Sequence, residues 1–247
     1  MKVFVDDSYE ASGVHAAEDL VEKVRFVNNP VVCTASGDSP AGLYKQIVDK
    51  VQKKQLDVSN WFFLGLDEWV GMNGSDEGSC RYHLDQQLFH PLQIPARRIC
   101  FFDGRAHDLE KECLRIEKFI QEHNGIDATI LGLGVNGHVG MNEPGTAAQT
   151  RSHVAELHDT TKQVGQKYFK NEQTLTQGLT LGIATLMESK HIILMISGRH
   201  KAAITQRIFE EEISEQLPAS LLRKHPSFSV YLEPASAQLM WVQSRKP

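Results

Sequence analysis

The stretch that decides the fold is ATILGLGVNGHVGMNEPGT, residues 128–146. It begins with an apolar run of strand length, ATILGLG at 128–134, and passes directly into a polar, glycine-rich segment. The apolar run is typical of a strand buried on both faces, and the segment behind it is too rich in glycine to be a helix. The chain therefore places a polar loop immediately after a buried strand, and the same arrangement recurs elsewhere.

Further apolar runs of strand length lie on both sides of this stretch: KVFV at 2–5, a candidate edge strand, then VVCTA at 31–35, WFFLGL at 61–66, HIILMIS at 191–197 and SFSVYLE at 227–233. Apolar residues at helical spacing fill the intervals and predict helices over 12–27, with Ser12 as N-cap, and over 41–54, 79–89, 108–123, 198–213 and 217–224. Buried strands that alternate with helices predict an α/β fold with a mainly parallel sheet and helices on both faces.

Composition supports a single domain over residues 1–247, because no linker, internal repeat or low-complexity tract interrupts the chain. A net charge of -5 lacks the basic footprint of a nucleic-acid binder. The N-terminal segment meets Asp6 and Asp7 before any long apolar run, so neither a signal peptide nor a membrane anchor is expected there. The four cysteines are widely spaced without a CxxC pair, which favours reduced thiols in a cytoplasmic protein.

Ligands of open α/β sheets bind outside the carboxyl ends of the strands. The segments SGDSP (36–40), DEW (67–69), GVNGHVGMNEPG (134–145) and SGRHK (197–201) all follow predicted strands. We expect these segments to converge on one site.

SGDSP leads into a helix expected to open at or just after Pro40. Helix N-terminal N–H groups and the hydroxyls of Ser36 and Ser39 form a cradle suited to a phosphate. Taken alone, the segment favours an ordinary N-cap and turn, and a carboxylate at Asp38 would repel a phosphate. Lys201 in SGRHK is either a second phosphate contact or a solvated lysine.

His138 stands among glycines, where few structural reasons explain an imidazole. Glu143 is close enough in sequence for a folded-back loop to bring its carboxylate to the ring and stabilise the imidazolium. Asn136 is placed to bind the same ring or a sugar hydroxyl. Asp67 ends another strand, where a carboxylate is either a proton-transfer base or a loop cap.

No serine or cysteine nucleophile lies next to His138 in the sequence, so general acid/base chemistry fits better than covalent catalysis. A histidine and a separate carboxylate suit a reaction with two proton-transfer stages, such as the opening of a sugar ring followed by enolisation. One histidine, one glutamate and amides are too few to bind a transition metal tightly, so we expect no metal.

Together, LDEWVG (66–71), LGLGVNGHVGMNEPGT (131–146), SGDSP and SGRHKA (197–202) resemble the glucosamine-6-phosphate deaminase/isomerase family. This family includes galactosamine-6-phosphate isomerases and is related to 6-phosphogluconolactonases. The resemblance spans most of the chain and implies a Rossmann-like fold. It also implies conversion of a 2-amino-2-deoxyhexose 6-phosphate to a ketohexose 6-phosphate and ammonia without a cofactor. The implied partner is the small amino-sugar phosphate itself, and both a monomer and a homo-oligomer remain open.

The resemblance also implies roles for individual residues. Asp67 matches the base that moves a proton between C2 and C1, His138 the ring-opening acid/base, and Glu143 its orienting partner. Asn136 stands where some members carry an aspartate and others an asparagine. The expected phosphate contacts are Ser36, Gly37, Ser39, Lys167 and Lys201.

Some positions depart from the family pattern. Asp38 replaces a small residue in the phosphate loop, and Lys167 replaces an arginine, and both changes are expected to weaken phosphate binding. Gly65 stands where many members have asparagine. Two positions of an effector site in allosteric members hold His153 and Ala155 here, so activation by an N-acetylated sugar phosphate is not expected.

Three alternatives follow from this pattern. Trp69 and the segment GSCRYHL (78–84) look more like the galactosamine-6-phosphate isomerase branch. A 6-phosphogluconolactonase is the second enzyme to consider, although lactonases usually carry arginine after the Asp-Glu pair and lack the Asn-Glu-Pro-Gly segment. A non-catalytic sugar-phosphate sensor is the third, motivated by Asp38 and Asn136.

Overall fold

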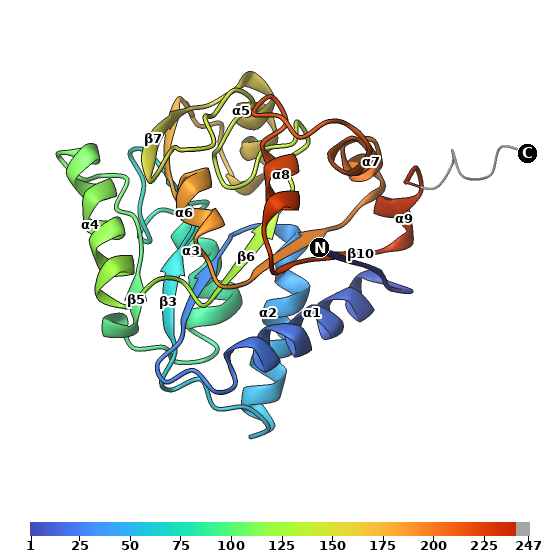
Figure 1. Ribbon diagram of the computed structural model, residues 1–247. Helices are drawn as coiled ribbons and strands as arrows, with labels where there is room; N and C mark the ends of the chain where they lie inside the picture. The colour runs from blue at the N-terminus through green and yellow to red at the C-terminus, as the bar shows by residue number, and fades with distance from the viewer. Residues whose placement is uncertain (241–247) are drawn as a thin grey trace, which may run out of the picture.

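A seven-stranded sheet forms the centre of the computed structural model, which describes residues 1–240 (Figure 1). Its strands in spatial order are β1 (Lys2–Val5), β10 (Phe228–Leu232), β9 (Ile192–Ile196), β6 (Ala128–Gly132), β2 (Val31–Thr34), β3 (Phe62–Gly65) and β5 (Ile99–Cys100). Neighbouring strands of this sheet pair in parallel. The mainly parallel α/β sheet predicted from the apolar runs is confirmed.

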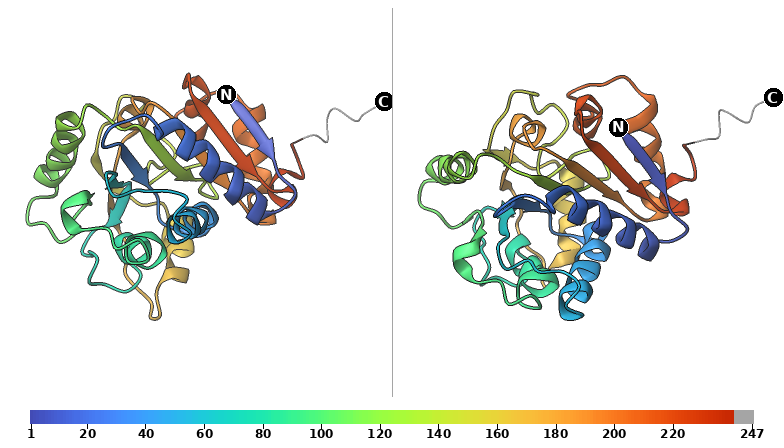
Figure 2. Two further views of the ribbon diagram at one scale, coloured as in Figure 1. Left: turned by 90° about the horizontal axis from the view of Figure 1, so that it is seen from below. Right: turned by 60° about the horizontal axis from the view of Figure 1, so that its bottom comes forward.

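Helices cover both faces of the sheet, as Figure 2 shows. Alternate side chains of each strand point to opposite faces, so the buried residues fall into two clusters. One face packs against α1 (Tyr9–Val24), α2 (Asp38–Gln52), α3 (Cys80–Leu84) and the π-helical turn Asp85–Phe89. The other face packs against α4 (Leu109–Glu122), α6 (Ile183–Met187), α7 (Ala202–Glu210) and α8 (Pro218–Leu221).

The first two helices begin earlier than their apolar spacing predicts. Ser8, not Ser12, is the N-cap of α1, and its hydroxyl accepts a hydrogen bond from the Ala11 N–H at 3.1 Å. Ser12 is buried within the helix and donates its hydroxyl to the Leu232 carbonyl at 2.7 Å. Helix α2 begins at Asp38 rather than near residue 41. Gly37 makes the turn from β2 into this helix with a φ of 116°, a conformation that favours glycine.

A second, antiparallel sheet was not predicted from the sequence. It consists of β4 (Asp67–Trp69), β8 (Gln177–Thr180) and β7 (His153–Glu156) in that order. These strands are short and partly polar, so they carry no apolar run. Helix α5 (Asp159–Gly165), which follows β7, was also not predicted.

The order of the large sheet reverses between β2 and β6: the chain proceeds outward from β2 to β3 and β5, then returns to β6 and proceeds to β9 and β10. Ligands of open α/β folds bind at such a reversal, beyond the carboxyl ends of the strands. Cys33, Cys80, Cys100 and Cys113 are buried free thiols. Over residues 1–240, no helix combines the length and apolar character needed to cross a membrane.

Candidate active site

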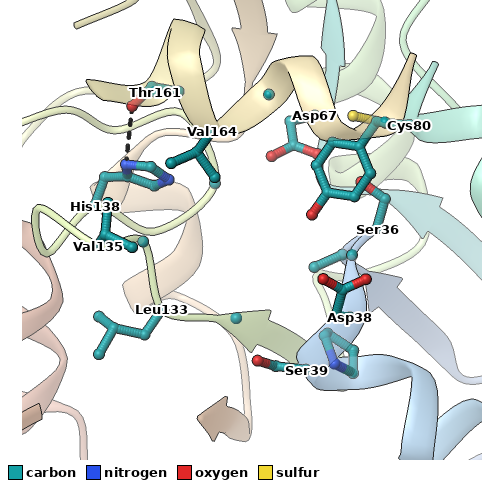
Figure 3. Close-up of a pocket in the computed structure, with 18 of the residues that line it drawn as sticks. Ser36, Asp38, Ser39, Asp67, Cys80, Leu133, Val135, His138, Thr161 and Val164 are labelled. Carbon is teal, nitrogen blue, oxygen red and sulfur yellow. Dashed lines mark hydrogen bonds between the residues drawn. The ribbon is translucent and has the colours of Figure 1, made fainter. Parts of the chain in front are cut away.

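The carboxyl ends of β2, β3, β6 and β9 open into a cavity of about 230 Å³ (Figure 3). All four segments expected to converge contribute to its lining. Of the residues singled out in the sequence, the cavity is lined by Ser36, Gly37, Ser39, Asp67, His138, Lys167 and Lys201. The segments therefore form one site rather than four unrelated loops.

The first part of the cavity is the turn from β2 into α2. Gly37 adopts a positive φ there, and a Cβ at this position would lie 3.2 Å from the hydroxyl of Tyr168. The turn directs the N-terminus of α2 toward the cavity, where the helix dipole favours an anion. The Ser39 hydroxyl lies 3.0 Å from the Ser197 hydroxyl at the end of β9, so this hydrogen bond joins two of the converging segments.

The two lysines reach the cavity from different elements. Lys201 follows β9 and donates its ammonium to the Leu133 carbonyl at 2.6 Å. Burial and, to a smaller extent, the nearby charge of Lys167 lower the pKa of Lys201 to about 8, while Asp38 opposes the shift. Lys167 donates to the Asp38 carboxylate at 2.6 Å, so in this structure its charge is already paired.

Asp67 and Glu68 are adjacent in sequence but differ in role. Asp67 lines the cavity and is only 8% exposed, and burial raises its pKa to about 7 against the opposing hydrogen bond with Cys80. Glu68 points away from the cavity and accepts N–H bonds from Trp69 and Cys80 at 2.9 Å each and from Arg81 at 3.0 Å. Asp67 is therefore the carboxylate available to a ligand, whereas Glu68 fastens the start of α3.

His138 lies across the cavity from Asp67 (Figure 3). Its Nδ1 atom is 3.3 Å from the Thr161 hydroxyl and 3.6 Å from a carboxylate oxygen of Glu143, which leaves Nε2 directed toward the cavity (Figure 3). Gly134 lies directly against the imidazole, because a Cβ there would be 2.4 Å from ring atoms. The glycine before the turn thus provides the space that the ring occupies.

Glu143 and Asn136 lie behind His138 rather than along the cavity lining. The side-chain NH₂ group of Asn136 donates to the Glu143 carboxylate at 2.7 Å, and the side-chain oxygen of Asn136 accepts the backbone N–H of His138 at 3.2 Å. Burial tends to raise the pKa of Glu143, but contacts with His138, Thr161 and Asn136 outweigh it and lower this pKa to about 2. An ionised carboxylate therefore stands behind the ring, 3.6 Å from its Nδ1 atom, where it can orient the imidazole.

Sequence reasoning did not single out several cavity residues. Thr161 contacts the ring of His138 from α5, in a stretch that carries no recognisable motif. Val164 lies in α5 and Tyr168 in the helical turn Gln166–Tyr168 after it, next in sequence to Lys167, which the sequence did single out. Cys80, Ser197 and His200 also line the cavity, and although they lie in segments quoted from the sequence, none of them was assigned a role. Only their position shortly after a predicted strand or helix start would have pointed to them.

No group of three or more histidine, cysteine or acidic residues suited to a metal ion occurs within residues 1–240. What the cavity combines is a helix N-terminus, two lysines, a buried carboxylate and a histidine with an anionic partner. The protein therefore belongs to the class of α/β proteins that bind a small anionic ligand where the strand order of a parallel sheet reverses. Its side chains are suited to transfer protons to and from that ligand.

Comparison with known proteins identifies the family within this class. The family model described as "Glucosamine-6-phosphate isomerases/6-phosphogluconolactonase" matches residues 8–231, and the chain belongs to this family. A glucosamine-6-phosphate deaminase of Geobacillus sp. (strain WCH70) is 35% identical over 247 residues, which cover 100% of this chain and 98% of the relative.

Solved structures agree with this assignment. A monomeric glucosamine-6-phosphate deaminase superposes with a TM-score of 0.93 at 34% identity, covering 97% of this chain and 100% of its own. The 6-phosphogluconolactonase from Trypanosoma brucei is 18% identical with a TM-score of 0.74, covering 96% of this chain and 97% of its own. The second likeness concerns the fold alone.

Proposed function

We propose that the protein is a glucosamine-6-phosphate deaminase. In this reaction 2-amino-2-deoxyglucose 6-phosphate and water yield the ketohexose 6-phosphate and ammonia, with no change in oxidation state overall. The observation that carries the proposal is that Asp67 and His138 line one cavity with the N-terminus of α2 and Lys201. The name shared by relatives at about 35% identity over the whole chain supports it.

The substrate phosphate is proposed to bind at the start of α2, with the hydroxyls of Ser36 and Ser39 and the ammonium of Lys201 around it. Backbone N–H groups and the helix dipole favour a dianion at such a position. Lys167 supplies a second cation once it is released from Asp38. This arrangement leaves the sugar carbons between Asp67 and His138.

Proton transfer is proposed to take place in two stages. His138, with Glu143 behind it, takes the proton of the C1 hydroxyl and delivers a proton to the ring oxygen, so that the C1–O5 bond breaks and the open-chain aldehyde forms. Asp67 then moves a proton from C2 to C1, which converts the amine at C2 to an imine. Water adds to this imine, ammonia leaves, and the ketone forms. A carboxylate with a pKa raised to about 7 is a far better base for this step than an ordinary one.

Ammonia release from glucosamine-6-phosphate by the purified protein tests the proposal. Galactosamine-6-phosphate is assayed beside it, because Trp69 and Cys80, which hinted at the galactosamine branch, both line the cavity. Hydrolysis of 6-phosphogluconolactone is measured on the same preparation. Lactone hydrolysis without ammonia would establish the lactonase instead, and tight binding of either sugar phosphate without turnover would indicate a sensor.

The pH dependence of kcat/KM is expected to be bell-shaped, with limbs near pH 7 and pH 8. Below the acid limb Asp67 is protonated, since burial raises its pKa to about 7, and the base is lost. Above the alkaline limb Lys201 loses its charge, since burial and Lys167 lower its pKa to about 8, and KM for the phosphorylated substrate rises.

Lys201→Arg separates the two limbs. A guanidinium stays charged throughout this range, so the alkaline limb should move beyond pH 9 while the acid limb is unchanged. Initial rates of ammonia release from pH 5.5 to pH 9.5 provide the measurement. An alkaline limb that stays near pH 8 in Lys201→Arg would assign it to a different group.

A further inference from the structure

The phosphate end of the cavity contains a carboxylate of its own. Asp38 is the first residue of α2, and its side chain is directed into the cavity (Figure 3). One carboxylate oxygen accepts a hydrogen bond from the Lys167 ammonium at 2.6 Å, across 129 residues of sequence. A cation at the site where a phosphate is expected is therefore already bound to an internal anion.

The pair is not built like a permanent structural salt bridge. Side-chain exposure is 47% for Lys167 and 73% for Asp38, so both groups remain accessible to solvent and to a ligand. Exposed ion pairs of this kind contribute little to stability, because water and salt screen them. A phosphate dianion offers Lys167 more charge and more acceptor oxygens than a carboxylate, so it is able to displace Asp38.

The backbone of Asp38 is held independently of its side chain. Tyr9 donates its hydroxyl to the Asp38 carbonyl at 2.6 Å and accepts the Gly42 N–H at 2.7 Å. The side chain can thus turn away, or be replaced, while α2 keeps its start. Lys201, the other lysine of the cavity, is bound to a carbonyl rather than to a carboxylate. Asp38 therefore forms a direct ion pair with Lys167 and acts on Lys201 only through its nearby charge.

We propose that Asp38 competes with the substrate phosphate for Lys167 and so sets the affinity of the phosphate end of the cavity. This inference rests on the proposed function, because it assumes that a phosphate binds at the start of α2. Asp38 acts against the ligand in two ways: it occupies the ammonium of Lys167, and its own charge repels the phosphate. The opposite role, in which Asp38 holds Lys167 in position for the phosphate, predicts an effect of opposite sign.

The test uses the variants Asp38→Asn, Lys167→Met and their combination, with inorganic phosphate titrated by calorimetry at pH 7 and 0.1 M salt. Asp38→Asn is expected to bind phosphate about tenfold more tightly than the natural protein, and Lys167→Met more weakly. In the Lys167→Met background the gain from Asp38→Asn should shrink to about threefold or less, because only the repulsive part remains. Asp49→Asn, which removes one charge from the same helix away from the cavity, should leave binding unchanged.

Phosphate binding to Asp38→Asn that is unchanged, weaker or undetectable would overturn the inference, as would an undiminished gain in the Lys167→Met background. KM for glucosamine-6-phosphate is measured on the same proteins and should fall in Asp38→Asn. The two proposals fail separately. Ammonia release with no gain in phosphate affinity rejects only the role of Asp38, whereas a gain in phosphate affinity without ammonia release rejects only the reaction.

Discussion

Asp67→Asn is expected to lower kcat for ammonia release by roughly 10²- to 10⁴-fold, the usual contribution of a general base, with KM changed little. The amide keeps the shape of the carboxylate and can still accept a hydrogen bond from Cys80, so the cavity stays intact. What the amide lacks is the basicity with which Asp67 is proposed to take up a proton from C2. Steady-state rates at pH 8, where Asp67 is ionised in the natural protein, provide the measurement, and a rate within tenfold of normal would mean that another group is the base.

The same substitution should make the protein more stable. Burial raises the pKa of Asp67 to about 7, so the folded state binds a proton more tightly than the unfolded state does. The stability that this proton provides is complete below about pH 4 and is lost as the pH rises through 7. Asp67→Asn cannot ionise and avoids this loss. We therefore expect its Tm at pH 8 to exceed that of the natural protein by roughly 2–8 °C, with the difference vanishing near pH 4.

Glu68→Gln is the matched control, because it neutralises the neighbouring buried carboxylate. The two carboxylate oxygens of Glu68 accept three backbone N–H bonds. Glutamine has only one such oxygen, so its NH₂ group would face at least one of these N–H donors. Burial raises the pKa of Glu68 to about 7 as well, so Glu68→Gln also avoids an ionisation cost at pH 8, but the lost N–H bond costs roughly 1–3 kcal/mol. We therefore expect the Tm of Glu68→Gln at pH 8 to lie below that of Asp67→Asn, and an equal Tm would show that the three N–H bonds of Glu68 contribute no stability.

The sequence predicted the large sheet, apart from the two-residue strand β5, because the central strands of this sheet are buried on both faces. Strand β9, for example, is apolar at every position, whereas a helix with one face in solvent carries polar residues at regular intervals. Strands β7 and β8 escaped prediction for the converse reason, because each is four residues long and partly polar. Strand β8 pairs with β7 on one side and, on the other, with β4, which is far away in sequence. Their pairing depends on tertiary contacts that leave no local signal.

The candidate site divides in the same way. Asp67, His138 and the start of α2 follow directly on strands, so the rule that carboxyl ends of parallel strands meet at one edge brought them together. Thr161 and the pairing of Asp38 with Lys167 depend on how α5 and the residues after it fold back over the cavity. The sequence identified Asp38 as a repulsive residue in a phosphate loop, but only the structure connects it to the lysine with which it is paired.

His138→Ala is expected to reduce kcat by roughly 10²- to 10⁴-fold, because it removes the group proposed to open the sugar ring. Thr161→Val removes one of the two contacts at Nδ1 and leaves Glu143 in place, so a loss of about tenfold or less is expected. Free imidazole added to His138→Ala should restore part of the activity, since the space beside Gly134 and Glu143 is preserved. Failure of all three expectations would move the ring-opening role to another residue.

Gly134→Ala tests whether the position of the ring, and not only its presence, matters. The added methyl would lie 2.4 Å from ring atoms of His138, well inside contact distance, so the imidazole must shift by about an ångström or more. Gly134 has no positive φ, so alanine does not strain the backbone at this residue. We therefore expect a folded protein with kcat reduced about 10- to 100-fold, since a small misplacement of a catalytic group has effects of this order. Normal kcat in Gly134→Ala would show that the packing of glycine against the imidazole is incidental.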